Sequence, residues 1–480
     1  MQWISGTLEL TSKVRYGLSS HGHPLFRFIP YDRRWSPFAV ASSLRDFSTN
    51  VHAIIEPLQG KGAMQKGSIV QLLGQPSEHT ERAMLLMSYA YDSNKDLRKI
   101  IPSSLSTFSE EKREVVEGFT FHIDPPGCRD VDDAFTFCRN GDGWKIYIHI
   151  SDVDAWIPSA STADAVARKR ASTFYSLEGK ALAPMFPPNI SEESATLLPS
   201  GTSYKPALSL CFSWSPGNEI YDVRWTKALV KCDRSFTYDE ASALVSTIPE
   251  LAALRDLSAE LCASERSSEE NVDPDDSHIW VQSLMILYNT RAGILLREKG
   301  KGILRRHSAK KKELLSKISV SALSHLGMTA AEYVDARDTD VAHAGLVRDA
   351  YAYATSPIRR YCDLVNQRYI KDILEHVSSA SPPVLDIPPL VAELNRRQKQ
   401  EKCFTRDMFF MQVLSGPSKQ VEGVAVSEKR VWIPEWKRCI TIKSKIIEGE
   451  SYTITWYENK GLPHWKERIV FRAVAKGEKK

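Results

Sequence analysis

Both ends of the chain carry short hydrophobic runs separated by Gly, Pro and Ser turns, a pattern typical of strands in small β domains. The runs within residues 1–95 predict a five-stranded barrel of the oligonucleotide/oligosaccharide-binding (OB) type. A second group, within residues 420–475, predicts another small barrel. The expected strands are 3–10, 25–29, 38–41, 51–55 and 68–73 in the first barrel, and 421–426, 431–433, 440–442, 452–456 and 468–473 in the second.

Residues 118–414 combine alternating strands with helical periodicity, which predicts a central α/β domain. A polar linker, residues 96–117, joins it to the first barrel. The fold class is therefore multidomain α+β, with an α/β domain flanked by two OB-type barrels. Helices are expected at 163–172, 280–299 and 390–414, with a helix pair between 238 and 271.

Composition narrows the class of protein. A hydrophobic content of 42% and a charged content of 25% are those of a globular protein, and no apolar run approaches the roughly 20 residues that span a bilayer. The N-terminus has no signal-peptide pattern. The net charge of +4 is small, so any site for nucleic acid must come from local clustering.

Eight scattered cysteines without a Cys-x-x-Cys pair argue against a zinc site and fit a reducing, intracellular compartment. We expect the cytoplasm, with nucleus and organelle left open.

One acidic stretch, residues 122–134, dominates the candidate chemistry. Pro125, Pro126 and Gly127 prevent a helix, so its aspartates should lie on a loop between two aromatic strands. Four carboxylates so close together repel one another, and a hard divalent ion such as Mg²⁺ would relieve this. The alternative is a solvated acidic turn, but the flanking aromatic strands favour a metal site. The four are Asp124, Asp130, Asp132 and Asp133.

A second informative stretch is residues 351–368. Ser356 is a suitable N-cap and Pro357 suits the first helical position, so a helix should begin there. Arg359 and Arg360 at its positive end would form an anion site, and the alternative is a surface arginine pair.

Three further features permit two interpretations each. The aromatic and arginine residues of 26–35 suit either stacking on single strands or an amphipathic strand. Tyr175 either packs in the core or stacks on a base. The basic segment containing Arg305 and His307 is either a solvated charge run or, as its apolar start favours, a partly enclosed phosphate-contacting strand.

Two motifs resemble those of the ribonuclease II family, the RNB-domain exoribonucleases. The first is the aspartate loop, residues 123–134, and the second is Thr-Ser-Pro-Ile-Arg-Arg-Tyr at 355–361, with Asp363 behind it. The resemblance spans nearly the whole chain. It implies a cold-shock-like N-terminal domain, a central RNB domain and an S1-like C-terminal domain.

The resemblance also implies an activity, namely processive, Mg²⁺-dependent 3′→5′ hydrolysis of single-stranded RNA to nucleoside 5′-monophosphates. Asp124, Asp130 and Asp133 would hold Mg²⁺, and Asp132 would be the acid most directly tied to cleavage. Arg359 would hold the scissile phosphate. Arg360 would support Arg359, Tyr175 would stack on the 3′-terminal base of the RNA, and Arg305 and His307 would line the RNA path. We expect a monomer, with association with an RNA-processing complex left open.

The sequence departs from the family pattern in places. Gln282 and Ser283 stand where adjacent glutamates are usual, and Thr405 stands where a glutamate often precedes the arginine. These departures put in doubt processivity, the length of the end product and the affinity for RNA, but not the cleavage chemistry. The rival hypothesis is a catalytically silent RNA-binding protein on the same fold, in a larger RNA assembly.

Overall fold

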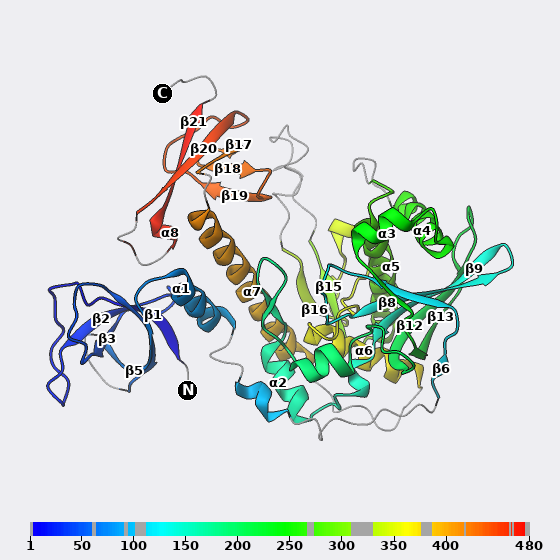
Figure 1. The fold of residues 1–480 in the computed structure, drawn as a ribbon, viewed down its shortest axis with the longest axis horizontal. Coiled ribbons are helices and arrows are strands. Elements are labelled where there is room, and N and C mark those ends of the chain that lie inside the picture. Colours follow the sequence, from blue (N-terminus) through cyan, green and yellow to red (C-terminus); the bar gives the residue numbers. More distant parts are fainter. Residues whose placement is uncertain are drawn as a thin grey trace.

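Two small β domains lie beside a larger α/β body in the computed structural model (Figure 1). The structure describes residues 3–59, 64–90, 95–100, 112–265, 273–308, 330–375, 386–416, 419–459, 462 and 465–475. The predicted linker, residues 96–117, therefore falls partly outside the described residues.

The N-terminal β domain is a closed barrel with strand order β1-β2-β3-β5-β4, and its core includes Leu8, Phe26, Phe28 and Val40. Because Phe26 and Phe28 are fully buried, the amphipathic-strand interpretation of residues 26–35 holds for these two rings. The elements are β1 (Ile4–Leu8), β2 (Leu25–Pro30), β3 (Phe38–Ala41), β4 (Val51–Pro57), β5 (Gln65–Gly74), α1 (Glu78–Leu85), η1 (Leu86–Ala90) and η2 (Lys95–Lys99).

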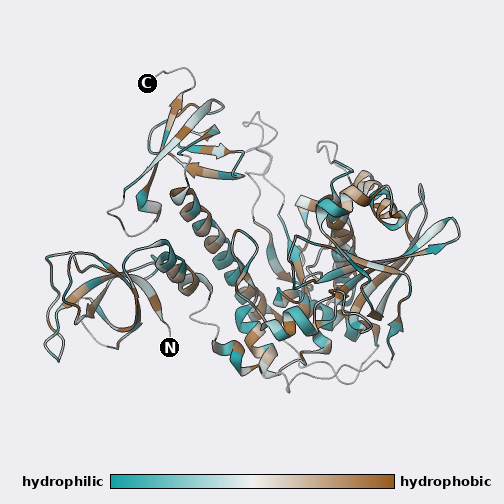
Figure 2. Ribbon diagram, in the orientation of Figure 1, coloured by the Kyte–Doolittle hydropathy of each residue, from teal (hydrophilic) through white to brown (hydrophobic). Residues whose placement is uncertain are grey.

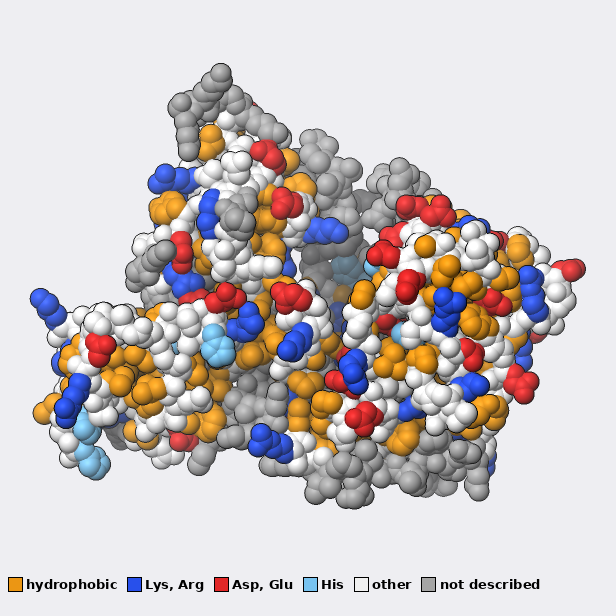
Figure 3. All heavy atoms as spheres, viewed as in Figure 1, with side chains coloured by type: hydrophobic (Ala, Val, Ile, Leu, Met, Phe, Trp, Pro, Cys, Tyr) orange, Lys and Arg blue, Asp and Glu red, His pale blue; other side chains and the backbone are white. Residues whose placement is uncertain are grey.

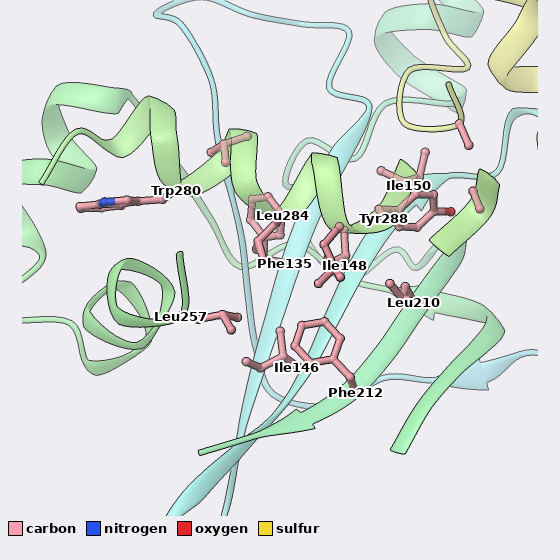
Figure 4. Close-up of a cluster of buried hydrophobic side chains, with 14 of the residues drawn as sticks. Phe135, Ile146, Ile148, Ile150, Leu210, Phe212, Leu257, Trp280, Leu284 and Tyr288 are labelled. Carbon is pink, nitrogen blue, oxygen red and sulfur yellow. The ribbon is translucent and has the colours of Figure 1, made fainter. Parts of the chain in front are cut away.

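The central body is organised around a seven-stranded sheet with strand order β14-β7-β8-β9-β12-β13-β6. Helix α5 lies across one face, where Leu284 and Tyr288 pack against Phe135, Ile148 and Leu210 (Figure 4). The strands are β6 (Glu114–Val115), β7 (Phe119–Ile123), β8 (Asp133–Asn140), β9 (Gly143–Ser151), β12 (Lys205–Trp214), β13 (Tyr221–Val230) and β14 (Arg234–Phe236).

Helices and two short hairpins complete the body. The predicted helices at 163–172, 280–299 and 390–414 are confirmed to within three residues at each end, and the predicted helix pair lies at 238–244 and 249–265. The elements are η4 (Val153–Ala155), α2 (Thr162–Arg170), β10 (Phe174–Tyr175), β11 (Ala181–Ala183), η5 (Asn189–Ser194), α3 (Tyr238–Leu244), α4 (Pro249–Glu265), α5 (Ser277–Lys299), β15 (Ile303–Arg306), β16 (Glu332–Asp335), η8 (Ala344–Leu346), α6 (Tyr361–Leu374) and α7 (Ile387–Ser415).

The helix expected to begin at Ser356 begins instead at Tyr361, so this prediction is wrong. The Ser356 backbone N–H donates to Asp363 Oδ1 at 2.8 Å, and Arg360 forms an isolated β-bridge with Ser172. These contacts hold residues 356–360 in a turn before the helix. The two arginines therefore lie on a turn rather than in the first turn of a capped helix.

The C-terminal β domain has strand order β19-β18-β17-β20-β21. It shares a hydrophobic cluster with α1 and with the last turns of α7, which mixes hydrophobic and hydrophilic residues along its length (Figure 2). Arg468 donates to Glu81 Oε2 at 2.8 Å and so ties the two β domains together. The elements are β17 (Gln420–Ser427), β18 (Arg430–Ile433), β19 (Arg438–Thr441), β20 (Ser451–Glu458), α8 (Trp465–Arg468) and β21 (Ile469–Ala475).

The described helices include none that is both long and apolar enough to cross a lipid bilayer. Acidic and basic side chains are interspersed over the face seen in Figure 3. This agrees with the small net charge and directs attention to local sites.

Candidate active site

The aspartate loop connects two antiparallel strands, as its prolines and glycine predict. It runs from the end of β7 to the start of β8, and Asp133 is the first residue of β8. The backbone N–H of Asp124 donates to the Phe236 carbonyl at 3.0 Å, which fixes the start of the loop to the end of β14. The sheet thus holds both ends of the loop.

Asp132 lies at the centre of the site and is only 4% exposed. Its Oδ1 accepts from the Ile358 backbone N–H at 2.9 Å, and its Oδ2 accepts from Arg359 Nε at 3.1 Å. Burial raises the pKa of Asp132 to about 7, against the opposing effect of Arg359. These contacts join the two sequence motifs at one carboxylate.

The other three aspartates surround this carboxylate. Burial, together with the charges of Asp124 and Asp132, raises the pKa of Asp133 well above its usual range. Asp124 Oδ2 lies 2.8 Å from His122 Nδ1, and Asp130 accepts from the Tyr175 hydroxyl at 2.7 Å. The four acids therefore influence one another electrostatically, as their spacing suggests.

All four aspartates line one cavity of about 730 Å³, which we call the aspartate cavity. Tyr175, Tyr238 and Arg359 also line it. A second cavity of about 600 Å³ lies along α7, and we call it the arginine cavity. The two cavities share Thr173, Tyr175 and Arg359, so they adjoin at these residues.

The donor set of the aspartate cavity suits a hard divalent cation, because all four candidate ligands are carboxylates and two have raised pKa values. The described residues nevertheless contain no three His, Cys, Asp or Glu side chains grouped as a formed metal site. Asp132 is also engaged by Arg359. The residues fit Mg²⁺ by chemistry, and binding would require their side chains to move closer together.

The arginine cavity is lined by cations from three parts of the chain. Arg359 and Arg360 come from the turn before α6, Lys402 and Arg406 from α7, and Arg438 from β19. Burial and the nearby Arg406 lower the pKa of Arg438. Such a concentration of positive charge is suited to a polyanion.

The guanidinium of Arg360 makes two contacts within the protein. Its Nη2 donates to Asp363 at 2.8 Å, and its guanidinium lies 4.2 Å from the centroid of the Tyr353 ring. It still lines the arginine cavity. Arg359, by contrast, lines both cavities and donates to Asp132 and Ser356.

Arg305 and His307 are buried, with exposures of 2% and 8%, and line neither cavity. The Arg305 guanidinium lies 4.3 Å from the Tyr333 ring centroid and 4.7 Å from that of Tyr353. His307 Nδ1 accepts from the Gly345 N–H at 3.1 Å. Arg305 on β15 and His307 directly after it therefore face the interior, and their predicted contact with RNA stays a prediction.

The departures from the family pattern fall in different surroundings. Ser283 is buried, and its hydroxyl donates to the Trp280 carbonyl within α5, whereas Gln282 is exposed. Thr405 lines the arginine cavity. Only Thr405 of these three therefore lies at a candidate site.

Several site residues were not found from the sequence. His122 bridges Asp124 and Ser235, and Tyr238 lines the aspartate cavity from the start of α3. Adjacency to Asp124 could have indicated His122. Glu401, Lys402 and Arg438 gave no local signal, because their meeting depends on how α7 and the C-terminal β domain pack.

A family model described as the RNB domain matches residues 112–326 and 312–376, more than half of the chain. The chain belongs to the RNB-domain family. Among curated RNB relatives, Exoribonuclease 2 of Psychromonas ingrahamii is 26% identical over 332 residues, covering 53% of this chain and 49% of that protein. Ribonuclease R of Aquifex aeolicus is 24% identical over 393 residues, covering 65% and 55%.

The chain thus spans about half the length of these two relatives. Its RNB fold also resembles solved structures. Mycoplasma genitalium RNase R in complex with ribose-methylated single-stranded RNA matches with a TM-score of 0.79 and 15% identity, covering 98% of this chain and 90% of that one. Yeast Ssd1, described as a pseudonuclease, matches with a TM-score of 0.70 and 17% identity, covering 92% and 65%. The predicted arrangement of an RNB domain flanked by OB-type domains is confirmed at the level of fold class.

Proposed function

We propose that this RNB protein is a Mg²⁺-dependent 3′→5′ exoribonuclease that hydrolyses single-stranded RNA processively to nucleoside 5′-monophosphates. The observation that carries the proposal is the junction at Asp132. There the aspartate loop meets Arg359 and the Ile358 N–H at hydrogen-bond distance, inside a cavity lined by all four acids. The names of the family relatives support RNA hydrolysis as the reaction.

Asp124, Asp130 and Asp133 would hold Mg²⁺, with Asp132 between them and Arg359. When bound, such an ion supplies activation of water and stabilisation of charge on phosphate oxygens. The chain's own contribution is to hold the carboxylates in place through His122, Tyr175 and the Ile358 N–H. Arg359, which lines both cavities, would hold the scissile phosphate and stabilise its developing charge.

The RNA strand would pass along the arginine cavity and present its 3′ end to the aspartates. The cations there match a phosphate backbone. Tyr175 lies where the cavities meet and donates a hydrogen bond from its hydroxyl to Asp130, and its ring would stack on the terminal base. We further propose a monomer in the cytoplasm, able to associate with an RNA-processing complex.

The rival function is RNA binding without cleavage. Two observations favour it, namely the engagement of both Asp132 oxygens by protein donors and the likeness to a protein described as a pseudonuclease. The presence of all four acids and both arginines weighs toward the enzyme.

The deciding experiment is incubation of the protein with 5′-labelled single-stranded RNA, with Mg²⁺ and with EDTA, and resolution of the products on a sequencing gel. The proposal expects short 5′-labelled remnants that appear only with Mg²⁺. RNA that stays intact but shifts on a binding gel would overturn the proposed activity in favour of the silent RNA-binding protein.

A further inference from the structure

One residue of the arginine cavity has the opposite charge to its neighbours. Glu401, on α7, lines this cavity together with Arg359, Arg360, Lys402 and Arg438. Burial raises the pKa of its carboxyl, and the charges of Arg360 and Arg359 oppose this shift. A carboxylate repels phosphate, so a carboxylate that lies along a path for RNA must interact with some other group of the RNA.

The contacts of Glu401 leave one oxygen available. Its Oε2 accepts a hydrogen bond from the Ser172 hydroxyl at 3.1 Å. The neighbouring arginines direct their side-chain hydrogen bonds elsewhere, Arg359 to Asp132 and Ser356, and Arg360 to Asp363. Within the described part of the chain, no side chain hydrogen-bonds Oε1 of Glu401.

A carboxylate can only accept hydrogen bonds, so its ligand must donate one. Along a single RNA strand, the donors outside the bases are the ribose 2′-hydroxyls, and each nucleotide carries one. The hydroxyl of Ser172 already makes this type of bond to the same carboxyl group. Base amino groups are the other donors, but they occur on only some bases.

We propose that Glu401 accepts a hydrogen bond from the 2′-hydroxyl of a nucleotide near the 3′ end, and that it thereby distinguishes RNA from DNA. This rests on the proposed function to the extent that RNA occupies the arginine cavity. Glu401 acts as a specificity-determining residue and takes no part in hydrolysis. The five cations that line the cavity bind the phosphates, while Glu401 binds the 2′-hydroxyl of the ribose.

The test measures binding in EDTA, so that it does not depend on hydrolysis. A set of otherwise identical single-stranded RNAs carries a single 2′-deoxy substitution at successive positions from the 3′ end. Dissociation constants are measured for the wild type and for Glu401→Gln and Glu401→Ala. Glu393→Ala is the matched control, because Glu393 lies on the same helix but pairs with Arg396 and Arg397.

For the wild type, we expect one deoxy position to weaken binding about tenfold, as for the loss of a hydrogen bond to a charged group. Glu401→Ala should weaken binding to all-ribose RNA by a similar factor and should be insensitive to deoxy substitution at that position. Glu401→Gln, which keeps an acceptor, should retain part of the discrimination. Glu393→Ala should behave like the wild type.

If Glu401→Ala raised the dissociation constant relative to the wild type by the same factor for every RNA in the set, whatever the deoxy position, the proposal would be overturned. Glu401 would then be a structural residue. A dependence on base identity rather than on the sugar would overturn it in favour of a base amino group. If the wild type bound no RNA at all, the proposed function itself would fail. If it bound RNA with the expected deoxy pattern but did not cleave with Mg²⁺, only the catalytic proposal would fail.

Discussion

The two cavities share Thr173, Tyr175 and Arg359 but are built in opposite ways. The aspartate cavity takes its negative charge from the nine-residue loop between β7 and β8 and from Asp133, the first residue of β8. The arginine cavity takes its charge from the turn before α6, from α7 and from β19 of the C-terminal β domain. The acidic chemistry is thus local in sequence, whereas the basic path exists only after three parts of the chain have packed together.

This difference predicts how substitutions in the two cavities affect hydrolysis and RNA binding. Asp132 is held by a backbone N–H and a guanidinium, so a small change there should affect the reaction strongly and binding little. The cations of the arginine cavity act together on a flexible polyanion, so the loss of one should affect binding moderately and the reaction little. Four experiments test this contrast.

The largest effect is expected for Asp132→Asn. RNA hydrolysis should fall by about a thousandfold or more while RNA affinity changes by less than about threefold, because only a group at the reacting centre is lost. Single-turnover hydrolysis and binding in EDTA measure the two quantities. Asp142→Asn, on the exposed β8–β9 turn, is the control. Near-normal turnover by Asp132→Asn would show that the reacting centre is elsewhere.

Arg359→Lys should lower the hydrolysis rate at saturating RNA by about a hundredfold. Lysine keeps the charge but cannot reproduce the guanidinium, whose Nε and Nη2 donate to Asp132 and Ser356 respectively. The measurement is the single-turnover rate, with Arg139→Lys on the exposed end of β8 as the control. If Arg359→Lys weakened RNA binding but left the rate at saturating RNA unchanged, Arg359 would be a binding residue like the other cations of the arginine cavity.

Arg438→Ala should weaken RNA binding about fivefold near 0.1 M salt and flatten the logarithmic salt dependence by about one unit, without changing the rate at saturating RNA. Arg438 lines the arginine cavity, whereas the exposed Arg430 on the neighbouring strand β18 does not. Arg430→Ala therefore serves as the control. Equal salt slopes for Arg438→Ala and the wild type would exclude a phosphate contact at Arg438.

The smallest effect concerns stability in EDTA. The pKa of Asp132 is raised from 3.8 to about 7, so between these values the folded protein binds more protons than the unfolded chain. Its stability should therefore fall as the pH rises from 5 to 8. Asp132→Asn should unfold about 2–4 °C above the wild type at pH 8, with a smaller difference at pH 5. Thermal unfolding at the two pH values measures this difference. Adding Mg²⁺ should reduce the difference in unfolding temperature between Asp132→Asn and the wild type at pH 8. A pH-independent difference would contradict the assigned cause.

Much of the fold followed from local pattern. The two sets of short strands at the chain ends, the aspartate loop between aromatic strands and the helices at 163–172 and 280–299 are all present. Each depends on residue spacing or on proline and glycine within a short window. The start of α6 was misplaced because Ser356 and Pro357 form a capping pattern, whereas Asp363 binds the Ser356 N–H and keeps the turn outside the helix.

The acidic loop, the arginine pair and the family can be predicted without a structure, because these are properties of contiguous residues. Tertiary structure alone decided that Asp132 meets Arg359, since 227 residues separate them. It also turned Arg305 and His307 inward and brought Glu401, Arg438 and Arg360 to one cavity. Such meetings follow from the packing of whole helices and domains, and a long-range contact leaves no periodic trace in the neighbouring sequence.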